Sequence, residues 1–477
     1  MISRERTAVG KDVWKTADSV TKHAISFGAS GAEALVYLRD DTVVRFSQNN
    51  ISQSVAYRDE GVQVRLFAGE SGYSTVTIKL LDDEQAIERG IQRGLALAKA
   101  GAGNKNTAAG LSRVGRIPRR NSNFRRGSTE VADAEIARRA KKSIDTSLNV
   151  DNSIKRVAGT ITSRVSYLAI RNSNGLDAYH QYTGASFVTA VLATENGSTG
   201  IGFSSQASNN LTELDFLAVS REAASDATSS VKPKATPMGR YDVIFYPYAV
   251  LDWLGSFVQL GFSTQRVKGY VEIGKQCASK CLSIVDDPTN PETLMAKPFD
   301  AEGTPTRKLT LIKEGLANAQ CYDISSAQKA GTKSTGHCPF SFDLTYESKF
   351  FPAWIYLPAN QIVNPGKSSL QDMIASSKRK TILVKRFMYG GLPMCVSETE
   401  NMQAYTMGTW LVEDGRIVHS LPSLRLSNAL SGLVQNISEV GDTGSVKRLG
   451  CMNVPCMKVT GVNFSLSTSM SVPQGVL

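Results

Sequence analysis

Histidine is scarce in this sequence, and the placement of the few that occur excludes a zinc site of the usual kind. The 477 residues include only His23, His180, His337 and His419. Two histidines one helical turn apart bind zinc from one face of a helix, with a nearby glutamate as general base. No two of these histidines lie that close together, so no such site can be built on them.

Long apolar runs are also missing. No stretch of about 18 apolar residues occurs, so we expect no transmembrane helix. The first residues, MISRERTAVGKDVWK, lack the apolar region of a signal peptide. The seven cysteines are an odd number, scattered along the chain, and do not form the pattern of a disulfide framework. We therefore expect a cytoplasmic protein with reduced thiols.

Positive charge is concentrated between residues 113 and 142, in a chain whose formal net charge is +11. The basic residues there are Arg113, Arg116, Arg119, Arg120, Arg125, Arg126, Arg138, Arg139, Lys141 and Lys142. Such a stretch can contact phosphate groups or an acidic peptide, or it can be a solvated linker and helix face. No nucleic-acid-binding motif accompanies it, which favours the solvated interpretation.

The first part of the chain alternates between helical and strand patterns. We expect a helix from about Arg4 to Phe27, and short strands separated by turns, one of them at Asp59-Glu60-Gly61. The other expected elements are strands 33–38, 43–47, 51–57, 62–67 and 72–78, and helices 83–99 and 128–148. This pattern predicts an antiparallel sheet with helices packed on one face.

Two long strands follow, 157–172 and 178–194, joined by the hairpin signal Ser173-Asn174-Gly175. Glu195-Asn196-Gly197 predicts the next turn, and a helix is expected over 212–231. A strand at Tyr241–Tyr246 and a helix from Tyr248 to Phe262 come next, and the remainder is mostly strands and turns. We predict an α+β fold: an N-terminal α+β domain over residues 1–150, a connecting region over 151–235, and a β-dominated C-terminal domain over 236–477, folded as a curved sheet or an open barrel.

One stretch, from Phe299 to His337, is the most informative part of the chain. Asp300, Glu302, Gly303 and Pro305 predict a chain reversal, followed by a strand, a turn at Lys313-Glu314-Gly315 and a helical turn at Ser325–Lys329. The stretch resembles the signature of the TldD/PmbA family, peptidase subunits that are also called modulators of DNA gyrase. The matching motifs are Phe299-Asp300-x-Glu302-Gly303-x-Pro305-Thr306 and Lys333-Ser334-Thr335-Gly336-His337. Further matches are Gly31-Ala32-Glu33, Gly61-Val62, Ser71-Gly72-Tyr73, residues 408–415 and residues 438–442.

The resemblance implies a particular comparison for the helix after the Tyr241–Tyr246 strand. In the catalytic branch of the family, a helix here carries His-Glu-x-x-x-His, and a C-terminal cysteine adds a metal ligand. In this sequence the helix reads AVLDWLGSFVQLGF from Ala249, without histidine or glutamate, and Asp252 is its one carboxylate. Cys451 lies near the place of the cysteine ligand. The resemblance therefore implies the metal-free PmbA/TldE type of subunit, with no metal, cofactor or catalytic residue in this chain.

Two cysteine arrangements remain as weaker candidates. Cys277-x-x-x-Cys281 would place two thiols on one face of a helix, but no second pair of ligands is nearby in the sequence. His337-Cys338 resembles a base beside its nucleophile, although neighbours on a strand point to opposite faces. Gly390-Gly391-Leu392-Pro393 predicts a turn and lacks the lysine of a phosphate-binding loop.

Three functions follow from these patterns. The first is a non-catalytic subunit of a cytoplasmic metallopeptidase complex that degrades or matures peptides, paired around an enclosed chamber with a TldD-like partner that holds zinc. A homodimer is expected where that partner is missing. The second is a nucleic-acid or gyrase-associated factor, suggested by the positive charge and the older family name. The third is a self-sufficient hydrolase with a cysteine nucleophile or an unusual set of metal ligands.

Overall fold

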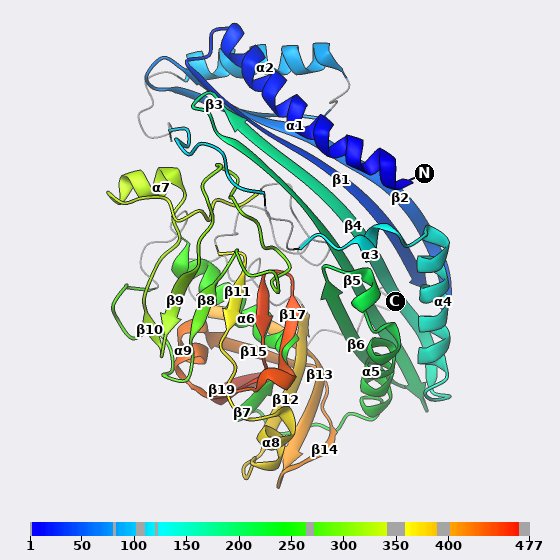
Figure 1. Cartoon of the computed structure of the whole chain (residues 1–477). Coiled ribbons are helices and arrows are strands. Elements are labelled where there is room, and N and C mark those ends of the chain that lie inside the picture. The colour runs from blue at the N-terminus through cyan, green and yellow to red at the C-terminus, as the bar shows by residue number, and fades with distance from the viewer. Residues whose placement is uncertain are drawn as a thin grey trace.

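The computed structural model describes residues 2–79, 83–101, 110–119, 123–263, 271–340, 358–388 and 401–466. In Figure 1 the first half of the chain forms a long curved sheet with helices on its outer side, and the second half lies on the other side. Among these residues, none of the helices is both long enough and apolar enough to cross a membrane. The predicted Gly390–Pro393 turn lies outside the described residues.

The first sheet has six strands in the order β3-β2-β1-β4-β5-β6, with every neighbouring pair antiparallel. Its strands are β1 (Gly31–Ser47), β2 (Asn50–Ala68), β3 (Gly72–Ile78), β4 (Ile154–Asn172), β5 (Asp177–Glu195) and β6 (Ser198–Ser208). The predicted antiparallel N-terminal sheet is confirmed. Because β1 pairs with both β2 and β4, strands from either side of residue 150 share one sheet.

Two interruptions predicted in this sheet are wrong. The stretch 39–42 continues β1, and Asp59-Glu60-Gly61 continues β2 instead of forming a turn. The reason is that charges here pair across the two strands: Arg39 Nη2 lies 2.9 Å from Asp59, and Arg58 Nε lies 2.8 Å from Asp40. Opposite charges on directly facing strands stabilise the pairing, so charged residues do not end either strand.

The two hairpin signals are confirmed. Residues Ser173–Leu176 connect β4 to β5, and Gly175 has φ of 92°. Asn196 and Gly197 connect β5 to β6, with φ values of 50° and 80°. Positive φ at both central residues is the geometry that a two-residue hairpin requires, and Asn-Gly adopts it readily.

The helices of this half cover a single face of the sheet, as predicted. They are α1 (Ile2–Ser26), α2 (Glu84–Ala100), α3 (Arg126–Thr129), α4 (Asp133–Leu148) and α5 (Phe216–Ser229), with a 3₁₀ turn η1 (Leu211–Glu213) before α5. Successive residues of β1 point to opposite faces of the sheet. Val36 packs with α1 and α2, and Phe46 packs with α4 and α5. Leu35 and Tyr37 point the other way, towards the signature stretch.

The C-terminal half contains a closed barrel. Its strands are β7 (Gly239–Phe245), β12 (Thr381–Met388), β13 (Asn401–Glu413), β15 (Leu424–Ala429) and β19 (Met457–Leu466), in the order β12-β7-β19-β15-β13. A further pairing of β12 with β13 closes the ring. The predicted β-dominated domain is thereby confirmed, with the barrel closed. The associated elements are α6 (Pro247–Phe262), α8 (Leu370–Ala375), α9 (Leu430–Gln435), β14 (Arg416–Ser420), β16 (Ile437–Val440) and η5 (Thr443–Ser445).

A third sheet lies beside the barrel, in the order β10-β9-β8-β11-β18-β17. Its strands are β8 (Ile284–Asp286), β9 (Leu309–Lys313), β10 (Leu316–Ala317), β11 (Gln361–Val363), β17 (Lys447–Leu449) and β18 (Met452–Val454). The predicted turn between β9 and β10 is confirmed, with Glu314 and Gly315 at φ of 49° and 78°. The return strand β10 is short and ends at Ala317. Helix α7 (Ile324–Lys329) follows.

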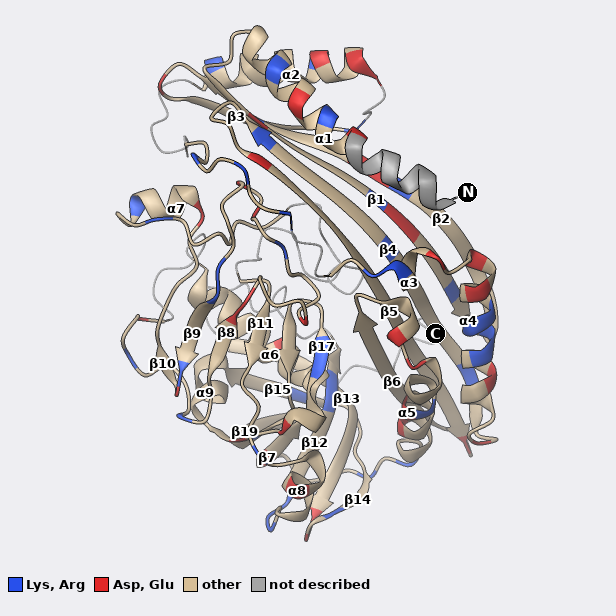
Figure 2. Cartoon of the chain, in the orientation of Figure 1, with Lys and Arg blue, Asp and Glu red and all other residues tan. Residues whose placement is uncertain are grey.

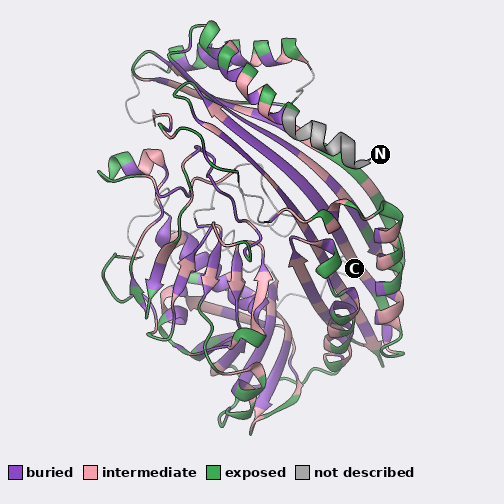
Figure 3. Ribbon diagram, viewed as in Figure 1, coloured by how far each residue is buried: buried purple, intermediate pink, exposed green. Residues whose placement is uncertain are grey.

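Burial follows this architecture. Figure 3 shows buried residues along the strands and exposed residues on the outer surfaces of the helices. The largest group of buried side chains surrounds α6 and the barrel, and the helix-covered face of the first sheet carries two more. A smaller group joins that sheet to the signature stretch, where Phe299 is fully buried against residues such as Leu35 and Leu176.

Candidate functional site

Helix α6 follows β7, where the family resemblance predicts the metal-binding helix of catalytic relatives. Pro247 occupies its first turn, a position that suits proline because the first N–H groups of a helix have no partner in the helix. Most of its side chains are buried, and Trp253 and Phe262 are fully so. The helix, all of which lies within the described residues, contains no histidine, glutamate or cysteine. Its residues do not fit a zinc ion.

Asp252 is the one carboxylate of α6. Burial raises its pKa to about 7, while the Arg386 guanidinium acts in the opposite direction. A single carboxylate without a neighbouring ligand one turn away on the helix cannot hold zinc in the tetrahedral arrangement that proteins use.

Cys451 lies close to α6, in the turn between β17 and β18. The backbone N–H of Gln361 donates to the Cys451 carbonyl at 2.8 Å. The side-chain amides of Gln361 and Gln259 both donate to the carbonyl of Pro358, at 3.2 and 2.9 Å. Gln259 belongs to α6, so the helix and Cys451 meet around one short segment. Cys451 packs against the core that surrounds α6.

The signature stretch begins with a tight turn organised by Asp300. Its Oδ1 accepts the backbone N–H groups of Glu302 and Thr304, at 3.0 and 2.9 Å, and its Oδ2 accepts that of Cys338 at 2.9 Å. Gly303 has φ of 67°, and a Cβ there would lie 2.1 Å from a Leu176 methyl group. The family motif is therefore a structural turn at which the carboxylate holds two distant segments together.

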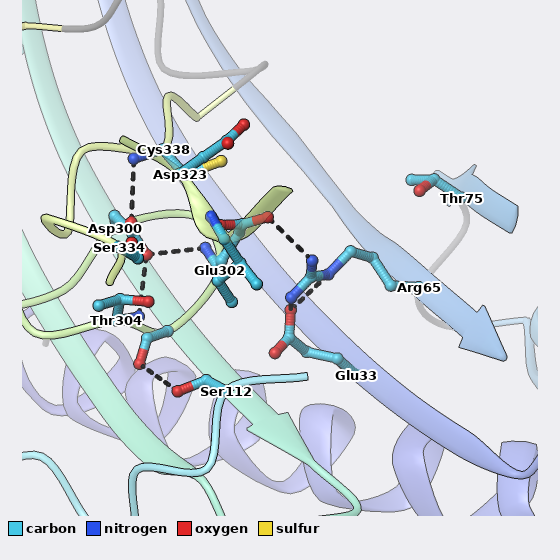
Figure 4. A network of polar contacts seen from close by, with 12 residues as sticks. Glu33, Arg65, Thr75, Ser112, Asp300, Glu302, Thr304, Asp323, Ser334 and Cys338 are labelled. Atoms are coloured by element: carbon cyan, nitrogen blue, oxygen red, sulfur yellow. Dashed lines mark hydrogen bonds and ion pairs between the residues drawn. The ribbon is translucent and has the colours of Figure 1, made fainter. Parts of the chain in front are cut away.

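Glu302 and Arg65 connect this turn to the first sheet, as Figure 4 shows. The Arg65 guanidinium lies between two carboxylates: Nη2 is 2.6 Å from Glu33 Oε1, and Nη1 is 3.2 Å from Glu302 Oε1. The second Glu302 oxygen accepts the backbone N–H of Ile324, at the start of α7, at 2.7 Å. Asn172 donates to Glu33 at 3.3 Å. All of these side chains are buried.

The charges in this cluster do not balance. Glu33, Asp300, Glu302 and Asp323 are carboxylates, and Arg65 is the cation between them. Burial raises the pKa of Glu33 above its usual value, although Arg65 opposes the change. Burial and the neighbouring Asp300 raise the pKa of Glu302 to about 8. A protonated Glu302 lowers the negative charge of the cluster at neutral pH.

The atoms of Glu302, Asp323 and Cys338 that could bind a metal lie within 4.8 Å of one another. Other partners already hold the two carboxylates. Glu302 contacts Arg65 and Ile324, and Asp323 Oδ1 caps α7 by accepting the Ser326 N–H at 2.7 Å. The arrangement thus has the hydrogen bonding of a structural clamp, and a cation there would have to replace part of it.

Cys338 lacks the environment of a nucleophile. Burial raises the pKa of its thiol well above the usual value, and the carboxylates of Glu302, Asp300 and Asp323 raise it further. The thiolate, which is the reactive form, is therefore suppressed. The adjacent His337 faces a different partner: its Nε2 lies 2.9 Å from Asp286 Oδ2, and its Nδ1 lies 2.9 Å from the Thr335 carbonyl. The two residues do not form a catalytic pair.

The prediction that Cys277 and Cys281 share a helix face is wrong, because residues 271–283 form turns and not a helix. Backbone N–H groups of Cys277 and Ala278 donate to the Gly315 carbonyl, which fixes this segment against the β9–β10 turn. The Cys277 thiol contacts the same carbonyl at 3.4 Å, whereas the Cys281 thiol contacts the Ile437 carbonyl. The two thiols have separate partners and do not form a metal site.

The basic stretch is partly neutralised on α4. On α4, Glu135 accepts from both Arg138 and Arg139, and Lys141 pairs with Asp145. Figure 2 shows the blue and red residues side by side along this helix. Arg119 lies over the ring of Tyr179, 4.7 Å from its centroid. Arg120 falls outside the described residues. The helix face is a solvated surface of paired charges.

A second polar cluster, missed in the sequence, joins α5 to the barrel. Glu222 on α5 contacts Lys385 of β12 at 2.6 Å, Lys447 of β17 at 3.2 Å and the Tyr246 hydroxyl at 2.7 Å. Burial alone would raise the pKa of Glu222, but the two lysines lower it to about 2. Lys385 also contacts Asp226 at 2.9 Å.

This cluster forms one wall of a cavity of about 780 Å³ between α5, β6, α8 and β17. Glu222, Tyr246 and Lys447 line it, together with Arg448 and Asp442. These partners lie far apart in the sequence, so no local motif indicates the cluster. The contact between Glu33 and Arg65 was not indicated by a local motif either, although Glu33 belongs to a segment that resembles the family.

Comparisons with known proteins agree with this architecture. The profile of the PmbA/TldA metallopeptidase central domain matches residues 128–231, and that of the PmbA/TldA metallopeptidase C-terminal domain matches residues 238–466. The metalloprotease PmbA of Escherichia coli O157:H7 is 25% identical over 70% of this chain and 71% of its own length. An uncharacterised protein of Methanocaldococcus jannaschii is 29% identical over 47% of this chain, and the match spans about half (51%) of that relative.

Solved structures share the fold. TldE from Thermococcus kodakarensis superposes with a TM-score of 0.81 at 20% identity, over 94% of this chain and 100% of its own. A Thermotoga maritima protein described as a modulator of a DNA gyrase gives a TM-score of 0.80 at 18% identity, over 94% of this chain and 99% of its own. With both family profiles matched along most of its length, the chain belongs to the PmbA/TldD family of metallopeptidases.

Proposed function

We propose that this chain is the zinc-free, non-catalytic subunit of a cytoplasmic TldD/TldE-type metallopeptidase complex that degrades or matures peptides. A TldD-like partner of the same family supplies the zinc ion and the catalytic residues. The two related chains enclose a chamber, and this chain contributes chamber wall, substrate selection and stability to its partner. In the absence of that partner the chain pairs with a second copy of itself.

The observation that carries the proposal is the composition of α6. The helix keeps its place after β7, and Gln259 and Cys451 still meet around Pro358, but the positions that would hold a metal carry apolar side chains and amides. Zinc requires deprotonated thiol, imidazole or carboxylate ligands, and α6 offers Asp252 alone. The name of the Thermococcus relative, TldE, agrees with a role beside a TldD-like partner.

The two polar clusters support a structural role. Arg65 and Glu302 tie the first sheet to the signature stretch, and Glu222 and Lys385 tie α5 to the barrel. Both clusters join segments from different parts of the chain, so they hold the two halves in one arrangement. A subunit that shapes a chamber for a partner needs such a fixed arrangement.

Neither alternative function gains support. On α4 the positive charge is partly neutralised, because Arg138 and Arg139 share Glu135 and Lys141 pairs with Asp145. The raised pKa of Cys338 argues against a cysteine hydrolase.

Co-expression of this chain with a TldD-like family member tests the proposal. Metal content and peptide cleavage are measured for each chain alone and for the purified pair. We expect a stable pair that contains zinc and cleaves peptides, with activity lost on adding a chelator. A pair that forms but shows no more cleavage than the partner alone would contradict the contribution of this chain.

A further inference from the structure

The outer edge of β2 is left open along its first half. Strand β3 pairs with Val62–Ala68 of β2 and extends no further. From Asn50 to Tyr57, β2 pairs with β1 on one side, and within the part of the chain that the structure describes no strand pairs with the other side. At about 3.3 Å per residue, this open edge is about 25 Å long.

Most side chains of this segment are also exposed, although α4 contacts β2 from the helix-covered face of the sheet. Seven of the eight residues of this segment are exposed, and Val55 is half-buried. The apolar residues Ile51 and Tyr57 are 39% and 37% exposed. They lie on opposite faces, because Ile51 pairs with Phe46 and Tyr57 pairs with Asp41 on β1. The remainder of β2, from Gly61 onward, is mostly buried.

The chain covers a comparable edge on the other side of the same sheet. Strand β6 is shorter than β5 and pairs only with Ala185–Glu195. The uncovered part of β5 is met by a loop: Ile117 N donates to the Asp177 carbonyl at 2.9 Å, and Thr183 N donates to the Asn123 carbonyl at 3.1 Å. No equivalent loop among the described residues reaches Asn50–Tyr57.

The composition of the open edge does not protect it. Proteins usually block exposed edges with lysine, proline, a bulge or a short strand. Residues Ile51–Tyr57 read ISQSVAY, with no charge, proline or glycine. One bulge does fall in this segment: Arg45 pairs with Gln53 and Phe46 with Ile51, so Ser52 is the extra residue, and from Gln53 to Tyr57 the pairing is regular. An uncharged, β-rich segment with unpaired backbone groups is a template for pairing with another strand.

Resting on the function proposed above, we infer that Asn50–Tyr57 of β2 is a docking edge for the family partner, whose own first sheet continues this one by antiparallel strand pairing. Main-chain hydrogen bonds would supply the contact, and Ile51 and Tyr57 would add cross-strand contacts on the two faces.

A related chain fits this edge better than an extended peptide substrate. The fold is shared over nearly the whole chain, so a family partner carries an equivalent sheet with an equivalent outer edge. Two such edges can pair antiparallel about a two-fold axis, which satisfies both at once. A peptide site would in addition need pockets for alternate side chains, and the cavity beside α5 is not lined by any residue of this edge.

The test is a pair of lysine variants compared in the co-expressed complex. In S54K/A56K, lysines replace two exposed edge residues, and they oppose strand pairing by charge and bulk. In the control T75K/T77K, the same charge is placed on β3, outside the docking edge. Pair formation is measured by analytical ultracentrifugation, with the zinc content and peptide cleavage of the same samples, and thermal unfolding checks that each chain folds.

We expect S54K/A56K to weaken the pair at least tenfold and T75K/T77K to leave it unchanged. Normal pairing by S54K/A56K in an active, zinc-containing complex would overturn the docking edge and leave the proposed function standing. If S54K/A56K loses self-association or peptide binding but still pairs normally with the family partner, the proposed docking edge is overturned as well. A wild-type chain that neither pairs with the partner nor affects its cleavage would overturn both.

Discussion

At the scale of single residues, the decisive feature is one arginine among several buried carboxylates. Arg65 contacts Glu33 and Glu302, which lie 32 and 237 positions away in the sequence. Its guanidinium fork matches two carboxylates at once, a geometry that lysine cannot provide. Removing one member of such a group leaves an unpaired buried charge, which costs far more than the loss of an exposed pair.

The variant Arg65→Met should therefore be strongly destabilised. We expect the free energy of unfolding to fall by about 3–5 kcal/mol, because the buried Glu33 carboxylate loses its cation and Glu302 loses a charged hydrogen-bond donor. Arg58→Met is the matched control. Arg58 pairs with Asp40 at the surface with its side chain 48% exposed, and its loss should cost about 0–1 kcal/mol. Denaturant unfolding of both variants measures the difference, and equal effects would contradict the clamp.

Glu302 makes the stability depend on pH. Its pKa is raised from 4.5 to about 8 in the folded chain, so between these values the unfolded chain has released a proton that the folded chain keeps. The free energy of unfolding should then fall as pH rises from about 5 to about 8. In Glu302→Gln that contribution is absent, and the decline should be smaller. Unfolding curves at several pH values test this, and parallel declines in both proteins would exclude Glu302 as the source.

At the scale of elements, sequence patterns predicted most of the secondary structure but not the contacts between elements. Helix α6, strand β3 and the two Asn-Gly or Ser-Asn-Gly hairpins were predicted nearly to the residue, because apolar periodicity and turn residues are local signals. The continuous strands β1 and β2 were not, since Asp59-Glu60-Gly61 has turn composition and Asp59 finds its partners far away in the sequence, in Arg39 on the facing strand and in Lys79 after β3.

The polar clusters could not be predicted for a related reason. Glu222, Lys385 and Lys447 come from three separate elements, and nothing in the spacing of each residue indicates its partners. By contrast, the Phe299–His337 motif was visible because its residues are close in sequence, although its contact with Arg65 was not. The absence of metal ligands on α6 was also visible, because a helical ligand pair would have to lie within a few residues.

Close packing of α5 on β6 gives a prediction at this scale. A Cβ at Gly202 of β6 would lie 1.8 Å from the Ala223 carbonyl oxygen of α5, so Gly202→Ala must displace the helix that carries Glu222. We expect a loss of about 1–3 kcal/mol in stability. Gly184→Ala on β5 is the control, since a Cβ there meets no atom within 4 Å. Thermal unfolding compares them, and an unchanged Gly202→Ala would refute the close contact.

At the scale of the whole molecule, the chain has the fold of its family, and α6 carries no histidine, glutamate or cysteine. The six-stranded sheet, the closed barrel and the signature turn are all present, and two polar clusters join them. The helix at the expected metal position is part of the largest core instead. This arrangement agrees with our proposal that the chain shapes and stabilises an active site provided by a partner.

The most direct test of this account is the zinc content of the purified single chain, measured together with its cleavage of peptides. We predict substoichiometric zinc and no cleavage, because α6 offers Asp252 as its one ionisable ligand. One zinc ion per chain with unaided peptide cleavage would contradict the central claim.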